Sequence, residues 1–136
     1  MSERLDWDQV WSRFAKVVSG RSTDPKHKVA AIIVSDDNTQ VLSIGYNGDE
    51  KGGTNQRVSL EKGSSGFIHA EINALIKCDF NNHKDKKMYL TLSPCIMCAK
   101  AIINAGIKEV IYNEIYDDDS LDLLRASGIK VRFFNE

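Results

Sequence analysis

MYLTLSPCIMCAKAIINAGIKEVIYN, residues 88–113, holds the pattern that decides the fold. Met88 to Leu92 is a short run of apolar and β-branched residues, which indicates a strand. Beyond Pro94 the apolar residues recur at helical spacing, and Gly106 stands where helices commonly end. Residues 108–113 form a second short run of strand-forming residues. Strand, helix and strand in this order predict two parallel strands with a right-handed crossover, and therefore an α/β fold.

The other predicted elements extend this unit in both directions. Before it come an amphipathic helix, two strands close enough in sequence to form a hairpin, a glycine-rich loop, and a second helix that begins near Ile68; after it come one more helix and one more strand. The first helix is predicted over 7–19, the two strands of the hairpin over 29–35 and 40–46, and the loop over 47–66. The last helix is predicted over 119–127 and the last strand over 130–134. The order predicts a three-layer α-β-α sandwich around a five-stranded mixed sheet. A length of 136 residues suits a single domain over 1–136.

The composition is that of an ordinary globular protein. The chain carries 18 basic and 19 acidic side chains, for a formal net charge of −1, and mixes them along its length. Nucleic-acid binders usually show a basic excess or a basic stripe, so we expect a small substrate and no nucleic acid. The one acidic run, Asp117 to Asp119, is expected in a solvated loop or at a helix N-terminus.

Nothing in the sequence directs the chain to a membrane or to secretion. No apolar run approaches the roughly 20 residues that a membrane span needs, and the first residues lack the apolar core of a signal peptide. We therefore expect a cytoplasmic protein, in the host cytoplasm if it is viral, with no membrane partner. Three cysteines, an odd number, do not suggest a disulfide framework. A Cys-x-x-Cys pair in a reducing compartment indicates metal or redox chemistry.

Two short motifs together indicate the chemistry. His69-Ala70-Glu71 precedes Pro94-Cys95-Ile96-Met97-Cys98 by 22 residues. Each motif is weak alone, because His-x-Glu is common by chance and Cys-x-x-Cys also occurs in redox pairs and structural zinc sites. Together, each at the start of a predicted helix, they form the arrangement typical of zinc-dependent nucleobase deaminases. We therefore identify His69, Cys95 and Cys98 as zinc ligands and Glu71 as the catalytic residue.

The spacing of these residues has a physical reason. Cys95 and Cys98 are three apart in the first turn of a predicted helix, so both sulfurs lie on one face. The positive end of the helix dipole favours their thiolate forms, and Pro94 has no N–H to lose there. His69 supplies a third ligand, which leaves the fourth tetrahedral position of a catalytic zinc ion for water. Glu71 would then carry protons from that water to the ring nitrogen and the leaving amine.

A structural zinc site with four protein ligands is the main alternative. Cys78 lies nine residues after His69 on the same predicted helix. At the helical rise this is about 13 Å, so we expect Cys78 to be a small buried residue. His83 stands among polar residues and is expected on the surface. His27 lies in a predicted turn and stays open as a fourth ligand. A redox pair would leave His69 and Glu71 unexplained.

Beyond these motifs, the chain resembles the deoxycytidylate (dCMP) deaminases of the cytidine deaminase superfamily, from about residue 9 to residue 134. Its short length is most similar to that of the bacteriophage members. The Gly-Tyr-Asn-Gly stretch and the Arg-Ser-x-Asp-Pro turn favour dCMP over other substrates. The matching stretches are residues 21–25, 28–34, 45–48, 69–74, 89–95, 98–100 and 106–110.

This resemblance implies a cytidine deaminase-like fold and the hydrolysis of dCMP to dUMP and ammonia, which supplies dUMP for thymidylate synthesis. Alternatives within the superfamily are deaminases of cytidine, guanine or a riboflavin precursor. A polynucleotide-editing deaminase is disfavoured by the mixed charge, because single strands are bound in a positive groove with stacking aromatics. A non-catalytic zinc-binding domain is disfavoured by Glu71, since a carboxylate beside a zinc ion with an open coordination position has no structural role.

The resemblance also implies where the substrate is held. Asn47 is expected to bond the sugar hydroxyl, Ser93 to present its backbone to the base, and Tyr116 to border the pocket. The turn before the first strand is expected to meet the 5′-phosphate, because a dianion needs charge-assisted donors. The donors expected in this turn are Arg21, Ser22 and Lys26.

Regulation is implied by the resemblance as well. Many members of the family are hexamers that dCTP activates and dTTP inhibits at a site between subunits, with Mg²⁺ on the triphosphate. The loop expected to take part here is marked by Gly48, Gly52, Gly53 and Asn55. The family usually has glycine where this chain has Ala30. Some members bind a second, structural zinc ion through Cys and His before His-Ala-Glu; residues 47–68 contain neither, so one zinc ion per chain is expected.

Overall fold

The structure is a computed structural model that describes residues 3–136, and within that range the predicted elements occur in the predicted order. The helices are α1 (Trp7–Ser19), α2 (Ala70–Lys77), α3 (Ile96–Ala105) and α4 (Asp118–Ala126). The strands are β1 (Ala30–Ser35), β2 (Val41–Tyr46), β3 (Lys86–Leu90), β4 (Glu109–Tyr112) and β5 (Lys130–Phe133). Among the helices of the described residues, none combines the length and the hydropathy that a membrane crossing requires.

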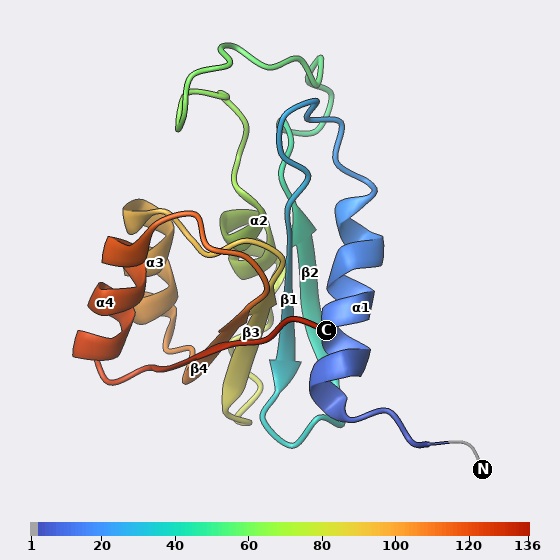
Figure 1. The fold of residues 1–136 in the computed structure, drawn as a ribbon, viewed down its shortest axis with the longest axis vertical. Coiled ribbons are helices and arrows are strands. Elements are labelled where there is room, and N and C mark those ends of the chain that lie inside the picture. The colour runs from blue at the N-terminus through green and yellow to red at the C-terminus, as the bar shows by residue number, and fades with distance from the viewer. Residues whose placement is uncertain (1–2) are drawn as a thin grey trace.

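The strands form one mixed sheet in the order β2-β1-β3-β4-β5 (Figure 1). β1 pairs antiparallel with β2 on one side and with β3 on the other. β3, β4 and β5 run parallel, with α3 and α4 as the crossovers between them. The predicted hairpin, the predicted parallel unit and the mixed sheet are therefore confirmed.

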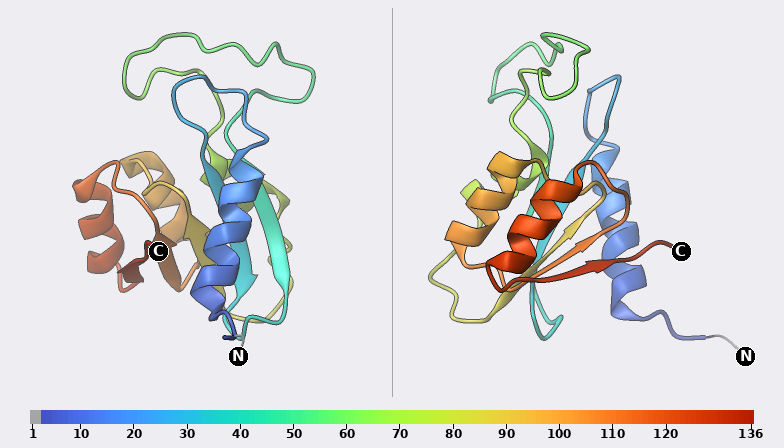
Figure 2. Two further views of the ribbon diagram at one scale, coloured as in Figure 1. Left: turned by 45° about the vertical axis from the view of Figure 1, so that its right-hand side comes forward. Right: turned by 60° about the vertical axis from the view of Figure 1, so that its left-hand side comes forward.

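The helices are divided unequally between the two faces of the sheet (Figure 2). α1 packs on one face, over Ile32 and Tyr89, whereas α2, α3 and α4 pack on the other, over Ile33 and Met88. Neighbouring residues of a strand point to opposite faces, so the wholly buried β1 contributes to both apolar cores. This is the predicted three-layer sandwich, and it brings the N-termini of α2 and α3 together.

Two helices begin slightly later than the sequence pattern predicts. α2 starts at Ala70 with His69 as its N-cap, and α3 starts at Ile96 with Cys95 as its N-cap. Both N-caps have extended backbone, as N-caps usually do. Pro94 therefore precedes α3 and does not occupy its first turn. The side chains of the two N-caps lie where the unpaired N–H groups of each first turn are found.

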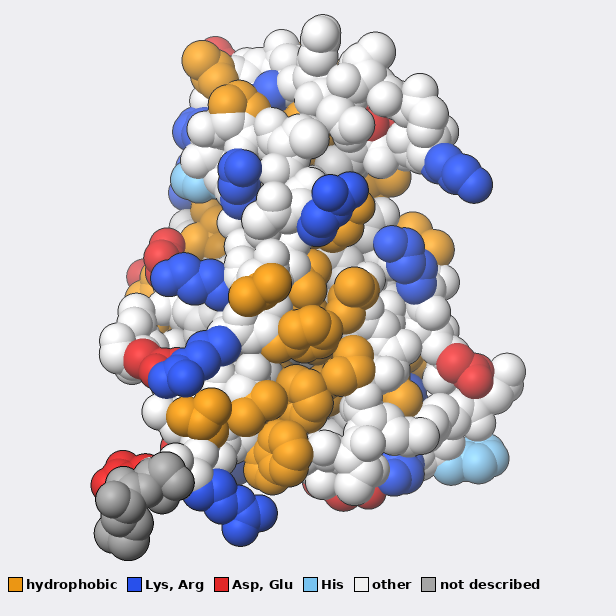
Figure 3. Space-filling model, turned by 90° about the vertical axis from the view of Figure 1, so that its right-hand side faces the viewer, with side chains coloured by type: hydrophobic (Ala, Val, Ile, Leu, Met, Phe, Trp, Pro, Cys, Tyr) orange, Lys and Arg blue, Asp and Glu red, His pale blue; other side chains and the backbone are white. Residues whose placement is uncertain are grey.

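One face of the molecule carries a band of hydrophobic side chains along α1 and β2 (Figure 3). Trp7 is 48% exposed, Val17 is 75% exposed, and Ile44 of the edge strand β2 is 38% exposed. Val17 shares the helical spacing of Val10 and Phe14, so the sequence pattern predicts it on the core face of α1, but it is exposed in the structure and that prediction is wrong. The stripe of α1 that is buried against the sheet runs through Val18 instead. A band of this kind on a protein surface often marks a contact with a partner.

Gly45 of β2 is where α2 approaches the sheet closely. A Cβ atom there would lie 2.4 Å from the Ala70 carbonyl oxygen and 2.5 Å from the Ala74 amide nitrogen. Because these are backbone atoms, the helix would have to move. We expect Gly45→Ala to lower the free energy of unfolding by about 2–3 kcal/mol in urea denaturation. Gly48→Ala is the control, since its Cβ would be 3.8 Å from the nearest atom. Equal midpoints for the two variants would contradict the close approach.

Candidate active site

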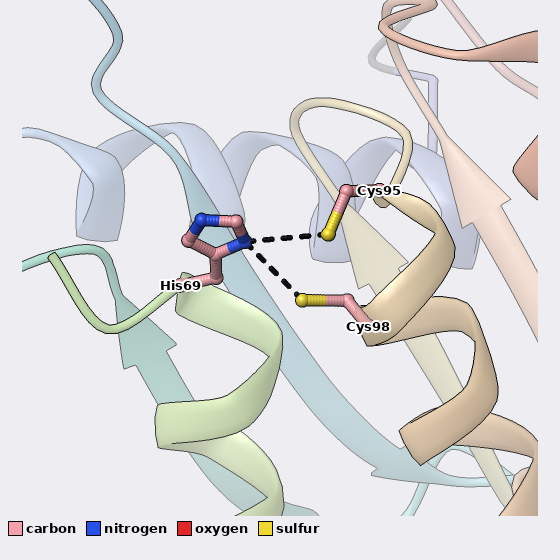
Figure 4. Close-up of side chains that lie close together, drawn as sticks. All are labelled: His69, Cys95 and Cys98. Atoms are coloured by element: carbon pink, nitrogen blue, oxygen red, sulfur yellow. Dashed lines mark hydrogen bonds between the residues drawn. The ribbon is translucent and has the colours of Figure 1, made fainter. Parts of the chain in front are cut away.

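His69, Cys95 and Cys98 converge where α2 and α3 begin (Figure 4). The Nδ1 atom of His69 lies 3.5 Å from the Cys95 sulfur and 3.3 Å from the Cys98 sulfur. Ligand bonds of ordinary length in a tetrahedral zinc site place nitrogen and sulfur ligands about 3.6 Å apart. The three side chains therefore have the spacing that zinc requires, and one imidazole with two thiols is a ligand set that suits this ion.

No fourth ligand joins this group within residues 3–136. Cys78 is buried in the core at the C-terminal end of α2, and His83 is exposed, both as predicted. His27, which the sequence leaves open, lines the neighbouring cavity without belonging to the group. Three candidate ligands match the pattern of an open catalytic zinc site, because a structural zinc site almost always has four protein ligands.

The protein groups of the site make Cys95 the thiol that ionises most readily. A hydrogen bond from Cys98 lowers the pKa of Cys95 to about 4; burial opposes this effect and a hydrogen bond from His69 reinforces it. The hydrogen bond between the cysteines raises the pKa of Cys98, and hydrogen bonding to Cys95 raises the pKa of His69. A thiolate at a helix N-terminus favours a divalent cation, which binds by displacing the remaining protons.

Glu71 lies in the first turn of α2, two residues after His69, and is only 3% exposed. Its side chain nevertheless lines the cavity beside the zinc-ligand cluster. Burial raises the pKa of Glu71, while the charge of His69 acts in the opposite direction. A carboxyl group with a raised pKa is better suited than a solvated one to give and take protons near neutral pH, as general acid–base catalysis requires.

A cavity opens beside this cluster. Its wall includes the buried Glu71 and the half-buried apolar side chains of Val29 and Leu92. Its exposed rim carries the cationic side chains of Lys26 and Lys62. A cavity that combines apolar side chains, a buried carboxyl group and exposed cations suits a flat heterocycle with an anionic group attached.

The residues predicted to contact substrate fall into two groups. Those that line the cavity are Asn47, Ser93, Tyr116 and Lys26. Arg21 and Ser22 are not among the lining residues. Arg21 is exposed just beyond α1. Ser22 is buried beneath the turn, where its hydroxyl donates to the Asn47 carbonyl oxygen and accepts from the Asp24 N–H. The structure thus gives Ser22 a supporting place and leaves Arg21 away from the cavity wall.

The side-chain amide of Asn47 is nearly saturated by hydrogen bonds within the protein. Its Nδ2 donates to the His27 carbonyl oxygen at 2.8 Å and to the Asp24 carboxylate at 3.2 Å. Its Oδ1 accepts from the Val29 N–H at 2.9 Å. An amide side chain has two donor hydrogens and two acceptor lone pairs. One lone pair on Oδ1 remains, so Asn47 can meet a sugar hydroxyl only as an acceptor.

Ser93 holds Tyr116 at the cavity wall. Its hydroxyl accepts from the Tyr116 N–H at 2.6 Å, and its own N–H donates to the Glu114 carbonyl oxygen at 2.8 Å. With that N–H engaged, only the carbonyl group of the Ser93 backbone can meet a base. The Lys62 ammonium lies 4.6 Å from the centre of the Tyr116 ring, so the glycine-rich loop contacts this tyrosine through a cation–π interaction.

The glycine-rich loop is anchored at its base and projects from one end of the sheet (Figure 1). Gly48 and Ile68 exchange backbone hydrogen bonds of 3.1 and 2.8 Å. Gly52 and Asn55 adopt left-handed backbone, with φ of 88° and 59°. The residues of the predicted regulatory segment do not line the cavity; these are Gly48, Gly52, Gly53 and Asn55. These four residues are therefore outside the wall of the cavity that His69, Cys95 and Glu71 line.

The sequence motifs miss a buried pair of side chains in the cavity wall, Asp24 and Arg57. The Arg57 Nε atom lies 2.9 Å from the Asp24 carboxylate. Arg57 is the one arginine in the loop of residues 47–66, and that is the signal the sequence offers. No local pattern indicates that its partner lies 33 positions earlier.

Known proteins resemble this chain in sequence and in fold. Residues 5–114 match the family described as the cytidine and deoxycytidylate deaminase zinc-binding region. A deoxycytidylate deaminase of Pongo abelii is 34% identical over 96% of this chain and 80% of its own. ComE operon protein 2 of Bacillus subtilis is 35% identical over 95% of this chain and 71% of its own. The crystal structure of a dCMP deaminase from the cyanophage S-TIM5, in complex with dCMP and dUMP, superposes with a TM-score of 0.82 at 30% identity, covering 98% of this chain and 100% of that one.

Proposed function

The chain belongs to the cytidine and deoxycytidylate deaminase family, and on this basis we propose that it hydrolyses dCMP to dUMP and ammonia. The observation that carries the proposal is an open His-Cys-Cys cluster with a buried carboxyl group beside it, in a cavity with a cationic rim. The relatives add the substrate, since those of Pongo abelii and Homo sapiens are named deoxycytidylate deaminases and the cyanophage enzyme is in complex with dCMP and dUMP.

The reaction replaces the 4-amino group of the pyrimidine by an oxygen atom from water. Glu71 accepts one proton from the attacking water and delivers it to N3 of the ring while a C–O bond forms at C4. Glu71 then moves the remaining hydroxyl proton to the amino group. The C–N bond breaks, ammonia leaves and the C4 carbonyl forms. One water enters and one ammonia leaves, so the atoms balance.

His69, Cys95 and Cys98 are the residues that would hold one zinc ion for this reaction. The chemistry that zinc supplies when bound is activation of water, whose pKa falls to about 7. The chain provides the rest: Val29 and Leu92 give the cavity an apolar wall for the ring. The buried carboxyl group of Glu71, with its raised pKa, can hold a proton between the two transfers.

The same geometry supports a set of substrate contacts. The free lone pair of Asn47 accepts from a sugar hydroxyl, the Ser93 carbonyl accepts from the amino group of the base, and Tyr116 borders the ring. Lys26 is the member of the predicted phosphate set that lines the cavity, so we place the 5′-phosphate at its end of the rim. Ser22 supports that turn from beneath.

A substrate panel tests the proposal. We expect zinc-loaded protein to turn over dCMP at least tenfold faster than deoxycytidine or dAMP, because only a 5′-phosphate can bind the rim cations and only a pyrimidine fits the family reaction. The loss of the amino group is followed by ultraviolet absorbance, and CMP in the same panel reports the sugar preference. Deoxycytidine turned over as fast as dCMP would keep the zinc chemistry but indicate a nucleoside deaminase.

We further propose a hexamer whose activity dCTP raises and dTTP lowers, each as its Mg²⁺ complex. The hydrophobic band along α1 and β2 supports self-association (Figure 3). The position of the predicted regulatory residues outside the cavity wall supports a separate effector site; these are Gly48, Gly52, Gly53 and Asn55. The substrate panel is therefore run with and without each triphosphate, and the mass of the assembly is measured in solution. Identical dCMP saturation curves with and without dCTP and dTTP would contradict the regulation.

A further inference from the structure

The buried ion pair of Asp24 and Arg57 lies in the wall of the substrate cavity, yet the deamination steps do not use it. Its side chains are 1% and 8% exposed. A buried ion pair contributes little net stability, because removing two charges from water costs about as much as their attraction returns. Its place in the cavity wall therefore indicates a role in substrate binding.

Arg57 has donor capacity to spare. Its Nε donates to the Asp24 carboxylate at 2.9 Å, and its Nη1 donates to the Ser59 carbonyl oxygen. Among residues 3–136, the Nη2 atom of Arg57 has no hydrogen-bond partner. Every side-chain nitrogen or oxygen that is fully buried in this range does have a partner, so Nη2 is not fully buried. The guanidinium is thus held at two points, through Nε and Nη1 on opposite sides of the group, while Nη2 stays accessible on a side chain that lines the cavity.

Asp24 connects this guanidinium to the sugar-binding amide. One carboxylate oxygen accepts from Arg57 and from the Lys26 N–H, and the other accepts from Asn47 Nδ2 at 3.2 Å. Burial alone would raise the pKa of Asp24, but the hydrogen bonds from Arg57 and Lys26 outweigh it and hold the pKa below its usual value. Asp24 therefore stays ionised at neutral pH and binds both neighbours at once.

We propose that Arg57 is the residue that distinguishes nucleotide from nucleoside, by donating from Nη2 to the 5′-phosphate, and that Asp24 positions both Arg57 and Asn47 for this purpose. The inference rests on the proposed function and names the specificity contact of the same site. The other cavity cations, Lys26 and Lys62, are exposed, where water screens their charge. A hydrogen bond from a largely buried arginine to a phosphate is stronger, because less water competes for it.

The test compares two substrates in zinc-loaded, full-length Arg57→Gln protein without triphosphates. We expect kcat/KM for dCMP to fall about 10- to 100-fold, and kcat/KM for deoxycytidine to change less than about threefold. Lys51→Gln is the matched control, since Lys51 is an exposed cation of the same loop that does not line the cavity. It should change neither value. An equal fall for both substrates in Arg57→Gln would show a merely structural role and overturn the inference.

Asp24→Asn tests the positioning role through the ratio of the two kcat/KM values. We expect Asp24→Asn to lower the ratio of kcat/KM for dCMP to kcat/KM for deoxycytidine in the parent protein. In Arg57→Gln the same change should lower the ratio little further, because each substitution removes the same contact between Arg57 and the phosphate. Independent effects on the ratio would contradict the coupling.

Arg57→Lys keeps the charge but cannot bind Asp24, Ser59 and a phosphate in one plane. We expect it to lose part of the preference while its thermal unfolding stays close to that of the parent. Inhibition by dUMP should be stronger than inhibition by deoxyuridine, and this preference should fall in the order parent, Arg57→Lys, Arg57→Gln. An unchanged dUMP preference in Arg57→Lys and Arg57→Gln would overturn the inference. A parent protein that does not deaminate dCMP would instead contradict the proposed function.

Discussion

Glu71→Ala is expected to lower kcat for dCMP by at least about 1,000-fold while the protein keeps one zinc ion and its fold. Two buried carboxyl groups, Glu71 and Asp24, line the cavity. Asp24 is engaged by hydrogen bonds from the Lys26 N–H, Asn47 and Arg57, so it does not replace Glu71 as the carrier of both protons. General acid–base groups contribute about 100- to 10,000-fold, and this one acts in two successive transfers. Steady-state kinetics, zinc analysis and circular dichroism on the same sample test the three parts of this expectation.

The matched control for this variant is Glu61→Ala. Glu61 is an exposed glutamate outside the cavity, so its loss should leave kcat within about twofold of the parent. Activity of Glu71→Ala within tenfold of the parent would rule out the proposed proton transfers. Loss of zinc together with activity would instead show that Glu71 supports the metal site.

Removal of zinc is expected to abolish turnover, and one equivalent per chain should restore it. Cys95→Ala should bind less than about a tenth of an equivalent and show no activity above background, because two ligands seldom hold zinc against water. Cys78→Ala is the control, since Cys78 lies buried in the core away from the cluster. It should keep both its zinc and its activity.

The zinc content of purified protein gives a further outcome. Two equivalents per chain would contradict the single site formed by His69, Cys95 and Cys98. A requirement for more than one equivalent of zinc to restore activity would also contradict the single site. The chelated protein should keep its helix and strand content, because the two apolar cores lie on the faces of the sheet and do not depend on the cluster.

Much of the fold could be predicted because its signals are local. The β1 run, the helical spacing after Pro94 and the stop at Gly106 each depend on residues a few positions apart, and the structure confirms the elements they predict. The grouping of the three predicted zinc ligands could be predicted for a related reason. His69, Cys95 and Cys98 belong to helix starts, so once α2 and α3 are predicted their first turns need only be brought together.

The rest depended on where the elements pack. Val17 has the spacing of a core residue, but its burial depends on how α1 lies on the sheet, and the structure exposes it. The loop of residues 47–66 has no periodicity, so nothing local predicts that Lys62 reaches Tyr116 or that Arg57 reaches Asp24.

The sequence by itself determined the order of elements, the sheet class, the three side chains proposed to hold a metal ion, and the reaction class, because periodicity and motif spacing are properties of the chain. Only the tertiary structure decided which cations line the cavity. It placed Lys26 and Arg57 in the wall and left Arg21 outside. The physical reason is that such contacts join segments more than 30 residues apart, as between Asp24 and Arg57, and depend on the path of a loop that no repeating pattern specifies.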